Sequence, residues 1–356
     1  MKRRLKVLFY GVTHEHGPGK LETLKRLKDD YEVVAVVDDR KTTGEQFQVE
    51  TFDFSGMNVV EEPAADIESL ARDVDVAFVE VANGRLMEIA EKFAGLGIPM
   101  HCDKPCGESM EPYKTLVGKC RAANLPFQIG YMYRGNPAIR WMWDFVAKGG
   151  LGEVSFVEAD MNHDYGYPED AYARYLSQFR GGIFYNLGCH LVDAVFPLVK
   201  ECDFDGAEMV LDDAPGYPKD SRTRAFATLR FGGARVVLRT SCGMGGGNLA
   251  RRLRVDGSKG TIDLCPIERF DGKDLRLILS LKGEEPREMA FGVQTDRYAA
   301  QLLDLAEIVR GERANDQDYD RDLKVHEIMM EAYGEIQAEQ SPSCSSIGRK
   351  QNESKW

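Results

Sequence analysis

The sequence lacks long apolar runs, a basic excess and a cysteine pattern typical of a metal or disulfide framework. No apolar stretch approaches the roughly 18 residues that a membrane-spanning helix needs. The net charge of −12 argues against a nucleic-acid or anionic-membrane partner, because both need a basic face. The first residues are charged but run directly into a strand pattern, so we do not expect a signal peptide.

The eight cysteines are spread along the chain without zinc-like pairing. Cys102 and Cys106 are four residues apart around a proline, and no second pair completes a site. Several others lie in apolar strand or helix patterns, as small buried residues do. We therefore expect reduced thiols, a cytoplasmic protein and no metal.

The first third of the chain alternates strand and helix patterns. An apolar run over 6–10 ends at Gly11, a helical pattern follows, and a second strand over 32–37 ends at Asp38. This order of strand, glycine turn, helix, strand and acid is typical of a dinucleotide-binding βαβ unit. Further strand patterns follow at 76–81, 98–102 and 127–130. The alternation predicts an α/β protein with a doubly wound parallel sheet.

Beyond about residue 130 the pattern changes to strands separated by hairpin signals. Helices are expected over 138–147 and 187–199, with a polar, aromatic loop over 163–182 between them. Gly232-Gly233 lies between two alternating runs and is a strong hairpin signal. We predict a second, α+β domain built on a large, mostly antiparallel open sheet.

The length of 356 residues favours two domains. We place a dinucleotide-binding Rossmann domain at 1–128 and a substrate-binding and oligomerisation domain at 129–340. A polar tail at 341–356 is expected to be disordered. The sheet of the second domain is expected to expose an apolar face, which favours a homodimer or homotetramer. The residues assigned to that face are Phe226, Leu229, Phe231, Val236 and Leu238.

The glycine turn departs from the G-x-G-x-x-G pattern. Gly11 is kept, but Thr13 and His16 stand where the second and third glycines would be. The first glycine still allows the tight turn, and backbone N–H groups at the helix start can meet a diphosphate. Thr13, His14 and His16 could add hydrogen-bond donors. An ordinary strand–turn–helix connection remains the alternative.

Asp38 ends the second strand, where an acid accepts hydrogen bonds from the adenosine ribose hydroxyls. A carboxylate there repels a 2′-phosphate, so NAD is favoured over NADP. Arg40 and Lys41 follow immediately and keep NADP open. The alternative is a solvated loop acid.

Asp103-Lys104-Pro105 follows the short strand over 98–102. Proline pushes the preceding residue out of the helical region, so Lys104 is extended at the carboxyl end of a strand. Ligands bind at that edge of open α/β sheets. A partly desolvated lysine there can titrate near neutrality and act as a general acid or base. A surface Lys-Pro turn is the alternative.

Asn186, His190 and Asp193 lie at i, i+4 and i+7, on one face of a predicted helix. A histidine held there could take the proton of a substrate hydroxyl while a hydride leaves the same carbon. Each residue also has a structural interpretation. Asn186 is a good helix cap, His190 could be a satisfied core histidine, and Asp193 could form an ion pair.

These motifs resemble the Gfo/Idh/MocA family of nicotinamide-dependent sugar and polyol oxidoreductases, which includes glucose-fructose oxidoreductase and inositol dehydrogenase. The family's Glu-Lys-Pro appears as Asp103-Lys104-Pro105, and its Asp-x-Gly-x-His-x-x-Asp helix appears at 186–193, after Gly181-Gly182. Ala82-Asn83 stands where the family has a nicotinamide-side loop, and 131–137 matches the segment that enters the second domain. The resemblance covers 5–338.

The resemblance implies a role for each matched residue. Lys104 would contact the nicotinamide ribose and the reacting hydroxyl, and His190 would be the catalytic acid or base. Asp103 would lie on the cofactor side or orient the lysine, and Ala82 and Asn83 would line the nicotinamide side. Asn186 replaces an aspartate of the family, so it can orient substrate but cannot take a proton. The division of labour between lysine and histidine therefore stays open.

The segment before the histidine helix fits the substrate side of such an enzyme, because aromatic faces stack on sugar rings and arginines bind hydroxyls or carboxylates. The residues expected to bind substrate are Tyr131, Arg134, His163, Tyr165, Arg180, Asn186 and His190. His163 and Asp164 could instead hold a metal with His190, although no spacing supports it.

The sequence thus predicts an NAD-dependent oxidoreductase that acts on a secondary alcohol of a sugar, glycoside or cyclitol. One alternative is a lyase or glycosidase that uses NAD transiently through a keto-sugar. The other is a non-catalytic, NAD-binding regulator.

Overall fold

The structure is a computed structural model. It describes residues 2–43, 52–62, 65–163, 169–200, 202–243 and 245–334. The predictions for Asp164, Tyr165 and the tail at 341–356 therefore lie outside the described residues.

Six parallel strands form the first sheet, in the order β3-β2-β1-β4-β5-β6. They are β1 (Leu5–Tyr10), β2 (Tyr31–Asp38), β3 (Val59–Glu61), β4 (Val76–Val79), β5 (Met100–Cys102) and β6 (Phe127–Ile129). The predicted doubly wound parallel sheet is confirmed. Its strand order reverses between β1 and β4, and ligands bind such sheets in the crevice at that point, beyond the carboxyl ends of the strands.

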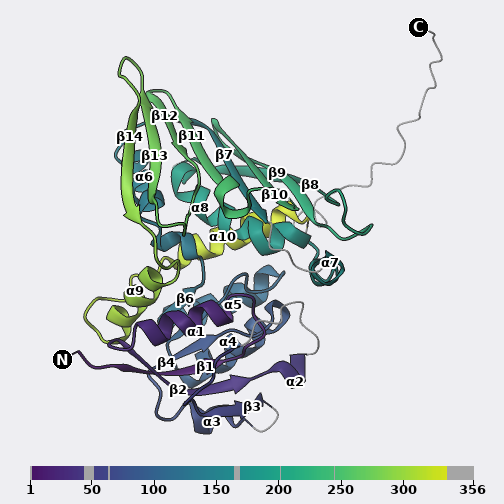
Figure 1. The fold of residues 1–356 in the computed structure, drawn as a ribbon, viewed down its shortest axis with the longest axis vertical. Coiled ribbons are helices and arrows are strands. Elements are labelled where there is room, and N and C mark those ends of the chain that lie inside the picture. The colour runs from purple at the N-terminus through teal and green to yellow at the C-terminus, as the bar shows by residue number, and fades with distance from the viewer. Residues whose placement is uncertain are drawn as a thin grey trace.

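Helices cover this sheet, so its central strands are apolar on both faces (Figure 1). Every residue of β4 is buried, as a strand between two helical layers requires. The helical elements of this region are α1 (Gly17–Arg26), α2 (Arg40–Thr43), α3 (Ile67–Leu70), η2 (Asn83–Arg85), α4 (Leu86–Leu96) and α5 (Met110–Ala122).

The second sheet has eight strands in the order β14-β13-β12-β11-β7-β10-β9-β8. They are β7 (Val154–His163), β8 (Phe204–Asp212), β9 (Arg224–Phe231), β10 (Ala234–Cys242), β11 (Arg252–Gly257), β12 (Gly260–Leu264), β13 (Asp274–Leu281) and β14 (Arg287–Val293). Only the β7–β10 pair is parallel. The predicted open, mostly antiparallel sheet is confirmed, and β9 and β10 are joined through Gly232-Gly233 as predicted.

Helices α6, α8 and α10 pack against one face of the second sheet. The helical elements of this half are η3 (Met132–Gly135), α6 (Pro137–Ala147), α7 (Glu169–Ser177), η4 (Phe184–Gly188), α8 (Cys189–Val199), η5 (Gly247–Ala250), α9 (Ala299–Val309) and α10 (Tyr319–Ala332). Helix α7 corrects the prediction of a loop over 163–182. Tyr172, Tyr175 and Leu176 give it an apolar face at helical spacing, and all three are buried.

The expectation of an exposed apolar sheet face is wrong for four of its five residues. Phe226 is 44% exposed, whereas the other four are fully buried on the helix-covered face. The buried four are Leu229, Phe231, Val236 and Leu238. Successive side chains of a strand point to opposite faces, so Phe226 cannot share a face with Leu229 or Phe231.

The outer face of the second sheet instead carries arginine–carboxylate pairs. The pairs are Arg224–Asp212, Arg230–Glu208, Arg239–Asp160, Arg252–Asp263 and Arg254–Asp256. The basis for the predicted homodimer or homotetramer is therefore lost, although the oligomeric state itself stays untested.

Helix α9 returns from the second half of the chain to the first sheet. Arg310 pairs with Asp30 at 2.9 Å, and Tyr31 donates a hydrogen bond to the Leu302 carbonyl. Gln128 and Gln301 bond reciprocally to the backbones of α9 and β6. The division into domains at 128/129 falls directly before the end of β6 and remains our interpretation.

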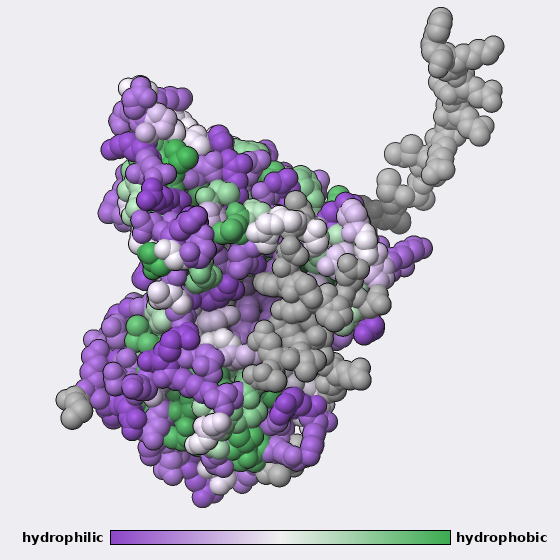
Figure 2. Space-filling view, viewed as in Figure 1, coloured by the Kyte–Doolittle hydropathy of each residue, from purple (hydrophilic) through white to green (hydrophobic). Residues whose placement is uncertain are grey.

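None of the described helices is long and apolar enough to cross a membrane. Hydrophilic residues cover most of the face shown in Figure 2, and hydrophobic residues gather in a patch over the lower part of the view, with smaller groups above it.

Candidate active site

Lys104 lies at the carboxyl end of β5 and is fully buried. Its Nζ donates hydrogen bonds to Glu15 Oε1 at 2.8 Å and to the Asn186 backbone oxygen and Oδ1, each at 3.0 Å. The structure therefore brings together the lysine and histidine-helix motifs, which are 82 residues apart in the sequence.

The charge of Lys104 differs from our expectation of titration near neutrality. Burial is the largest single effect and lowers the pKa of Lys104, but the negative charges around it, that of Glu15 first and Asp103 among the others, together outweigh burial and raise the pKa above its ordinary value. Burial likewise acts to raise the pKa of Glu15, yet Lys104 first, together with His16 and His14, outweighs burial and lowers that pKa to about 2. The pair is thus an ammonium ion and a carboxylate at neutral pH.

His190 lies in the first turn of α8 and is 1% exposed. No described residue donates to or accepts from either of its ring nitrogens. Aromatic rings surround it, with centroids 5.9 Å away at His16, 6.2 Å at Tyr131 and 5.7 Å at Tyr133. Burial first, and then the positive charge of Lys104, lowers the pKa of His190 well below 6.5. His190 is therefore a neutral imidazole with both nitrogens available.

A π-helical turn, η4, places Asn186 beside Lys104. Such turns are rare and occur frequently at functional sites. Gly182, just before this turn, has a φ of +46°, and a Cβ there would lie 2.5 Å from the Cβ of Arg222. The conformation and the contact both require glycine, which explains the Gly181-Gly182 pair before the helix.

The third residue of the helix pattern, Asp193, has a structural role. Its carboxylate accepts hydrogen bonds from Arg134 at 2.7 Å and from Arg321 at 3.0 Å. Arg134 also pairs with Asp322 at 2.6 Å. Arg134, which we expected to bind substrate, is thus held in a buried ion-pair network instead.

Arg180 contacts Glu108. Its guanidinium donates to the Glu108 backbone oxygen. It lines a surface groove of about 640 Å³ with residues of β8, β9 and the end of α10. Its role in substrate binding therefore stays a prediction.

The glycine turn follows β1. Gly11 has a φ of +95°, and a Cβ there would lie 2.5 Å from Val81, so only glycine fits. Asp39, which the sequence analysis did not single out, accepts from the Val12 N–H at 2.8 Å and from the Thr13 hydroxyl. Thr13 Oγ1 in turn accepts from the Ala82 N–H at 2.9 Å. Thr13 therefore joins the glycine turn to the nicotinamide-side loop predicted at Ala82-Asn83.

Asp38 ends β2 as predicted, and its partner is close in sequence. Arg40 Nε lies 2.9 Å from Asp38 Oδ1, and this hydrogen bond lowers the pKa of Asp38. The carboxylate is ionised, as the ribose-binding role requires.

A buried charged cluster lies between the glycine turn and β5. Asp103 accepts from Lys20 and faces the Nδ1 atoms of His14 and His16, each at 3.1 Å. Lys20 also donates to Glu80 Oε1 at 2.9 Å. Burial acts to raise the pKa of Asp103, but the His14 and Lys20 charges outweigh it and hold that pKa well below its ordinary value. Burial raises the pKa of Glu80 well above its ordinary value.

Lys20 and Glu80 were not predicted as site residues, although the sequence carries a signal for each. Glu80 is an acid within the apolar run over 76–81, and Lys20 shares a helix face with the buried Leu24. Charged residues at such positions are almost never fully buried unless they are paired.

Donor atoms of His14, His16 and Asp103 all lie within 4.8 Å of one another, which is compatible with a metal ion. The ammonium of Lys20 already neutralises Asp103, however, so the cluster does not require one. The alternative metal site at His163 involves Asp164, which lies outside the described residues. The prediction of no metal stays untested.

Aromatic residues cover the lysine. The Tyr172 hydroxyl accepts from Asn186 Nδ2 at 3.0 Å, and the ring of His163 stacks on Tyr172 with centroids 6.1 Å apart. Tyr175 donates to Asn83, and Asn83 Nδ2 donates to the Lys104 backbone oxygen at 2.9 Å. Asn83 and His163 are thus connected to the site as predicted residues, whereas Tyr172 and Tyr175 are additions from α7.

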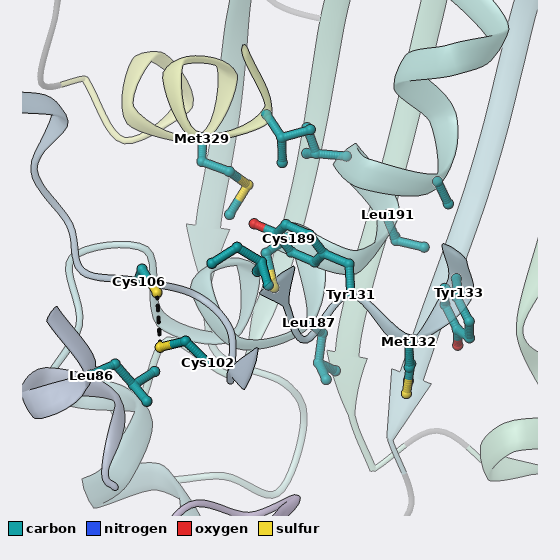
Figure 3. Packing of buried hydrophobic residues seen from close by; sticks show 14 of the residues in the cluster. Leu86, Cys102, Cys106, Tyr131, Met132, Tyr133, Leu187, Cys189, Leu191 and Met329 are labelled. Atoms are coloured by element: carbon teal, nitrogen blue, oxygen red, sulfur yellow. Dashed lines mark hydrogen bonds between the residues drawn. The ribbon is translucent and has the colours of Figure 1, made fainter. Parts of the chain in front are cut away.

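Packing on the other side of Lys104 is apolar. Figure 3 shows Cys102 and Cys106 facing each other, with Sγ atoms 3.4 Å apart, and Tyr131 beside Cys189. Burial raises the pKa of Cys102 well above its ordinary value, so this thiol is protonated at neutral pH. The described cysteines form no disulfide. Tyr131 therefore links this apolar cluster to the ring of His190.

Two family models match the chain. Residues 5–131 match the oxidoreductase family with an NAD-binding Rossmann fold, and residues 139–263 match the GFO/IDH/MocA C-terminal domain. The fold and these two matches define an NAD(P)-binding oxidoreductase. The chain belongs to the Gfo/Idh/MocA family.

Solved structures show the same architecture. An inositol dehydrogenase homolog from Azotobacter vinelandii, complexed with NADH and myo-inositol, has a TM-score of 0.73 at 14% identity and covers 94% of this chain and 96% of its own. Aldose-aldose oxidoreductase from Caulobacter crescentus has a TM-score of 0.73 at 21% identity, with 95% and 99% covered. A 3-ketoreductase from Actinomadura kijaniata, complexed with NADP, has a TM-score of 0.72 at 17% identity, with 92% and 96% covered. At these identities the similarity shows the fold.

A shorter match is to the rhizopine catabolism protein MocA of Rhizobium meliloti. It is 25% identical over 123 residues, which are 35% of this chain and 37% of that protein. The match therefore spans little more than a third of that relative.

Proposed function

We propose that the protein is an NAD-dependent oxidoreductase that moves a hydride between a secondary alcohol of a sugar, glycoside or cyclitol and nicotinamide. The observation that carries the proposal is the pairing of an ammonium group with an unpartnered, neutral imidazole in one buried site. Lys104 supplies the first group and His190 the second.

The residues around the glycine turn fit a dinucleotide. Gly11 makes the tight turn where the strand order reverses, and α1 begins at Gly17, after residues 12–16 of the turn. Backbone N–H groups at the start of α1 would hold the diphosphate. Thr13, His14 and His16 would surround it.

Other residues would bind the rest of the cofactor. Asp38 would accept hydrogen bonds from the adenosine ribose, which favours NAD, while Arg40 leaves NADP as the less favoured cofactor. Ala82, Asn83 and Asp103 would lie on the nicotinamide side. When bound, the nicotinamide accepts the hydride or returns it.

The protein's own residues would handle the hydroxyl proton. Lys104 would exchange one of its two hydrogen bonds to Asn186 for one to the substrate oxygen, and would stabilise the negative charge that develops on that oxygen. His190 would take the hydroxyl proton as the carbon–hydrogen bond breaks and the carbonyl forms, and would pass that proton to solvent. In reduction the same groups would act in reverse.

The first experiment is calorimetric binding of NAD and NADP, followed by a panel of sugars, glycosides and cyclitols monitored by nicotinamide absorbance. We expect NAD to bind more tightly than NADP, with net NADH formation that Lys104→Met and His190→Phe abolish. Products without net NADH would instead identify a lyase or glycosidase with a transient keto-sugar. Tight binding without turnover would identify a regulator, and binding of neither cofactor would refute the proposal.

A further inference from the structure

Glu15 lies within the glycine turn, between the two histidines that face Asp103. Its side chain is 6% exposed, and burial of a carboxylate needs compensation. Both carboxylate oxygens point at the lysine site. Oε1 accepts from Lys104 Nζ at 2.8 Å, and Oε2 lies 3.4 Å from Asn186 Nδ2. A residue of the cofactor-binding turn thus holds the lysine of the other motif.

We propose that Glu15 is a positioning residue that keeps Lys104 an ammonium ion aimed at the substrate oxygen, which leaves proton transfer to His190. This inference rests on the proposed function and resolves how the two groups divide the proton chemistry. Glu15 itself touches neither substrate nor the reacting atoms.

The geometry gives Lys104 one close anionic partner. The Nζ has three acceptors: the charged Glu15 and the two neutral oxygens of Asn186. Its other titratable neighbours come from several elements. They are Asp103 on its own strand end, Cys189 and His190 on α8, His16 at the start of α1 and His163 on β7.

The effects of these neighbours on Lys104 differ. Burial raises the pKa of the Cys189 thiol to about 12, and burial lowers the pKa of His16 to about 4, so both are neutral at working pH. Asp103 is shared with Lys20, His14 and His16. Glu15 is therefore the carboxylate that contacts Lys104 directly and that contributes most to offsetting the cost of burying its charge.

Removing the charge of Glu15 should lower the pH at which Lys104 loses its proton. Glu15→Gln keeps the shape and a hydrogen-bond acceptor, but it removes the largest effect that opposes burial and leaves the more distant Asp103 carboxylate, so the pKa of Lys104 falls. A lysine that stabilises the substrate oxygen works only while it is protonated. The basic limb of the activity profile should therefore move toward neutral pH.

The test compares the pH profiles of kcat/KM for alcohol oxidation between pH 6 and 10. In the wild type we expect no basic limb in this range. In Glu15→Gln we expect a limb with a midpoint below pH 10 and a kcat that falls about tenfold or more, with a smaller change in KM. Glu15→Asp keeps the charge and should restore a profile without that limb. Loss of activity in Glu15→Gln without a moved limb would overturn the proposal, because a structural role alone predicts that result.

A second readout needs no activity. In protein labelled with ¹³C at the lysine ε carbons, the signal missing from Lys104→Met identifies Lys104. We expect that signal not to titrate up to pH 10 in the wild type and to titrate below pH 10 in Glu15→Gln. Identical titrations would overturn the role of Glu15 even if the enzyme proved active. A wild type that turns over no substrate, but shows the expected difference in titration, would refute the proposed function and leave the ion pair established.

Glu88→Gln is the matched control. It removes one carboxylate from an exposed face of α4, where Glu88 pairs with Lys92. Both readouts should match the wild type. A shifted limb in this control would mean that any lost negative charge moves the profile, which would overturn the specific role of Glu15.

Discussion

Asn186 accepts two hydrogen bonds from the ammonium of Lys104, one at its backbone oxygen and one at Oδ1, each 3.0 Å long. Its amide nitrogen meanwhile faces Glu15 Oε2 and the Tyr172 hydroxyl. The amide thus supplies an acceptor on one side and a donor on the other. An aspartate, which the family often has here, supplies only acceptors.

We therefore predict that Asn186→Asp destabilises this protein. It places a second carboxylate 3.4 Å from Glu15, and only one ammonium is available for both. The free energy of unfolding should fall by about 1–3 kcal/mol at pH 7, measured by urea denaturation. Adding Glu15→Gln should recover part of that loss, because the two changes are coupled. Additive effects of the two substitutions would contradict this account.

Two adjacent acids should have separable effects on cofactor binding. Asp38→Ser removes the carboxylate that repels a 2′-phosphate and frees Arg40, so the ratio of NADP to NAD affinity should rise by about tenfold or more. Asp39→Asn disturbs the glycine turn instead, because Asp39 holds Val12 and Thr13. It should weaken both cofactors equally. Calorimetry with NAD and NADP measures this affinity ratio in each variant. An unchanged ratio in Asp38→Ser would contradict the ribose-binding role.

The strand pattern and the two motifs predicted the fold because they are local signals. Continuous apolar runs identify strands covered on both faces, and the Gly232-Gly233 pair identifies a hairpin. The outer sheet face was predicted wrongly because Phe226 was grouped with residues whose side chains point to the opposite face of the sheet. Counting alternate positions along β9 would have separated Phe226 from Leu229.

Contacts between distant residues could not be predicted in the same way. The sequence places a lysine at a strand end, but its charge depends on Glu15, which is 89 positions away. The cluster of Lys20, Glu80 and Asp103 likewise forms only when α1, β4 and β5 pack together. Such interactions are set by tertiary structure, so neither partner alone indicates them.

Acid should destabilise the protein before its carboxylates titrate. Burial lowers the pKa of His16 and His326 to about 4 and of His101 to about 3, and it lowers those of His163 and His190 well below 6.5. Below pH 6.5 these groups bind protons in the unfolded chain but not in the folded one. The stability they contribute is therefore complete above pH 6.5 and is lost as the pH falls.

Each such histidine adds about 1.4 kcal/mol per pH unit to the slope of unfolding free energy against pH. Urea denaturation at pH 8, 6 and 5 measures that slope. His326→Gln should reduce it by one proton, because His326 lies on α10 and far from the lysine site in sequence. A free energy of unfolding that does not change between pH 6 and pH 5 would contradict the prediction.

If copies of the chain associate through the second sheet, the contact is polar. The outer face carries Arg239–Asp160 and Arg252–Asp263 beside the exposed Phe226. Exposed charges are screened by salt, so we expect an assembly of this kind to weaken between 0.05 and about 1 M salt. Light scattering at each salt concentration measures the molar mass of the assembly. A dimer or tetramer that strengthens with salt would indicate an apolar interface elsewhere.

The chain crosses between its two halves more than once. It leaves the first sheet after β6, and it returns with α9, whose Gln301 is fastened to the end of that same strand. The chain then passes on to α10, which packs against α8 and β8 of the second half and against α5 of the first, so the two halves are joined at several points. Lys104 lies in the first half and Asn186 in the second. A movement that separated the two halves would therefore break the hydrogen bonds of Lys104 to Asn186. Its bond to Glu15, which lies in the same half, would stay in place.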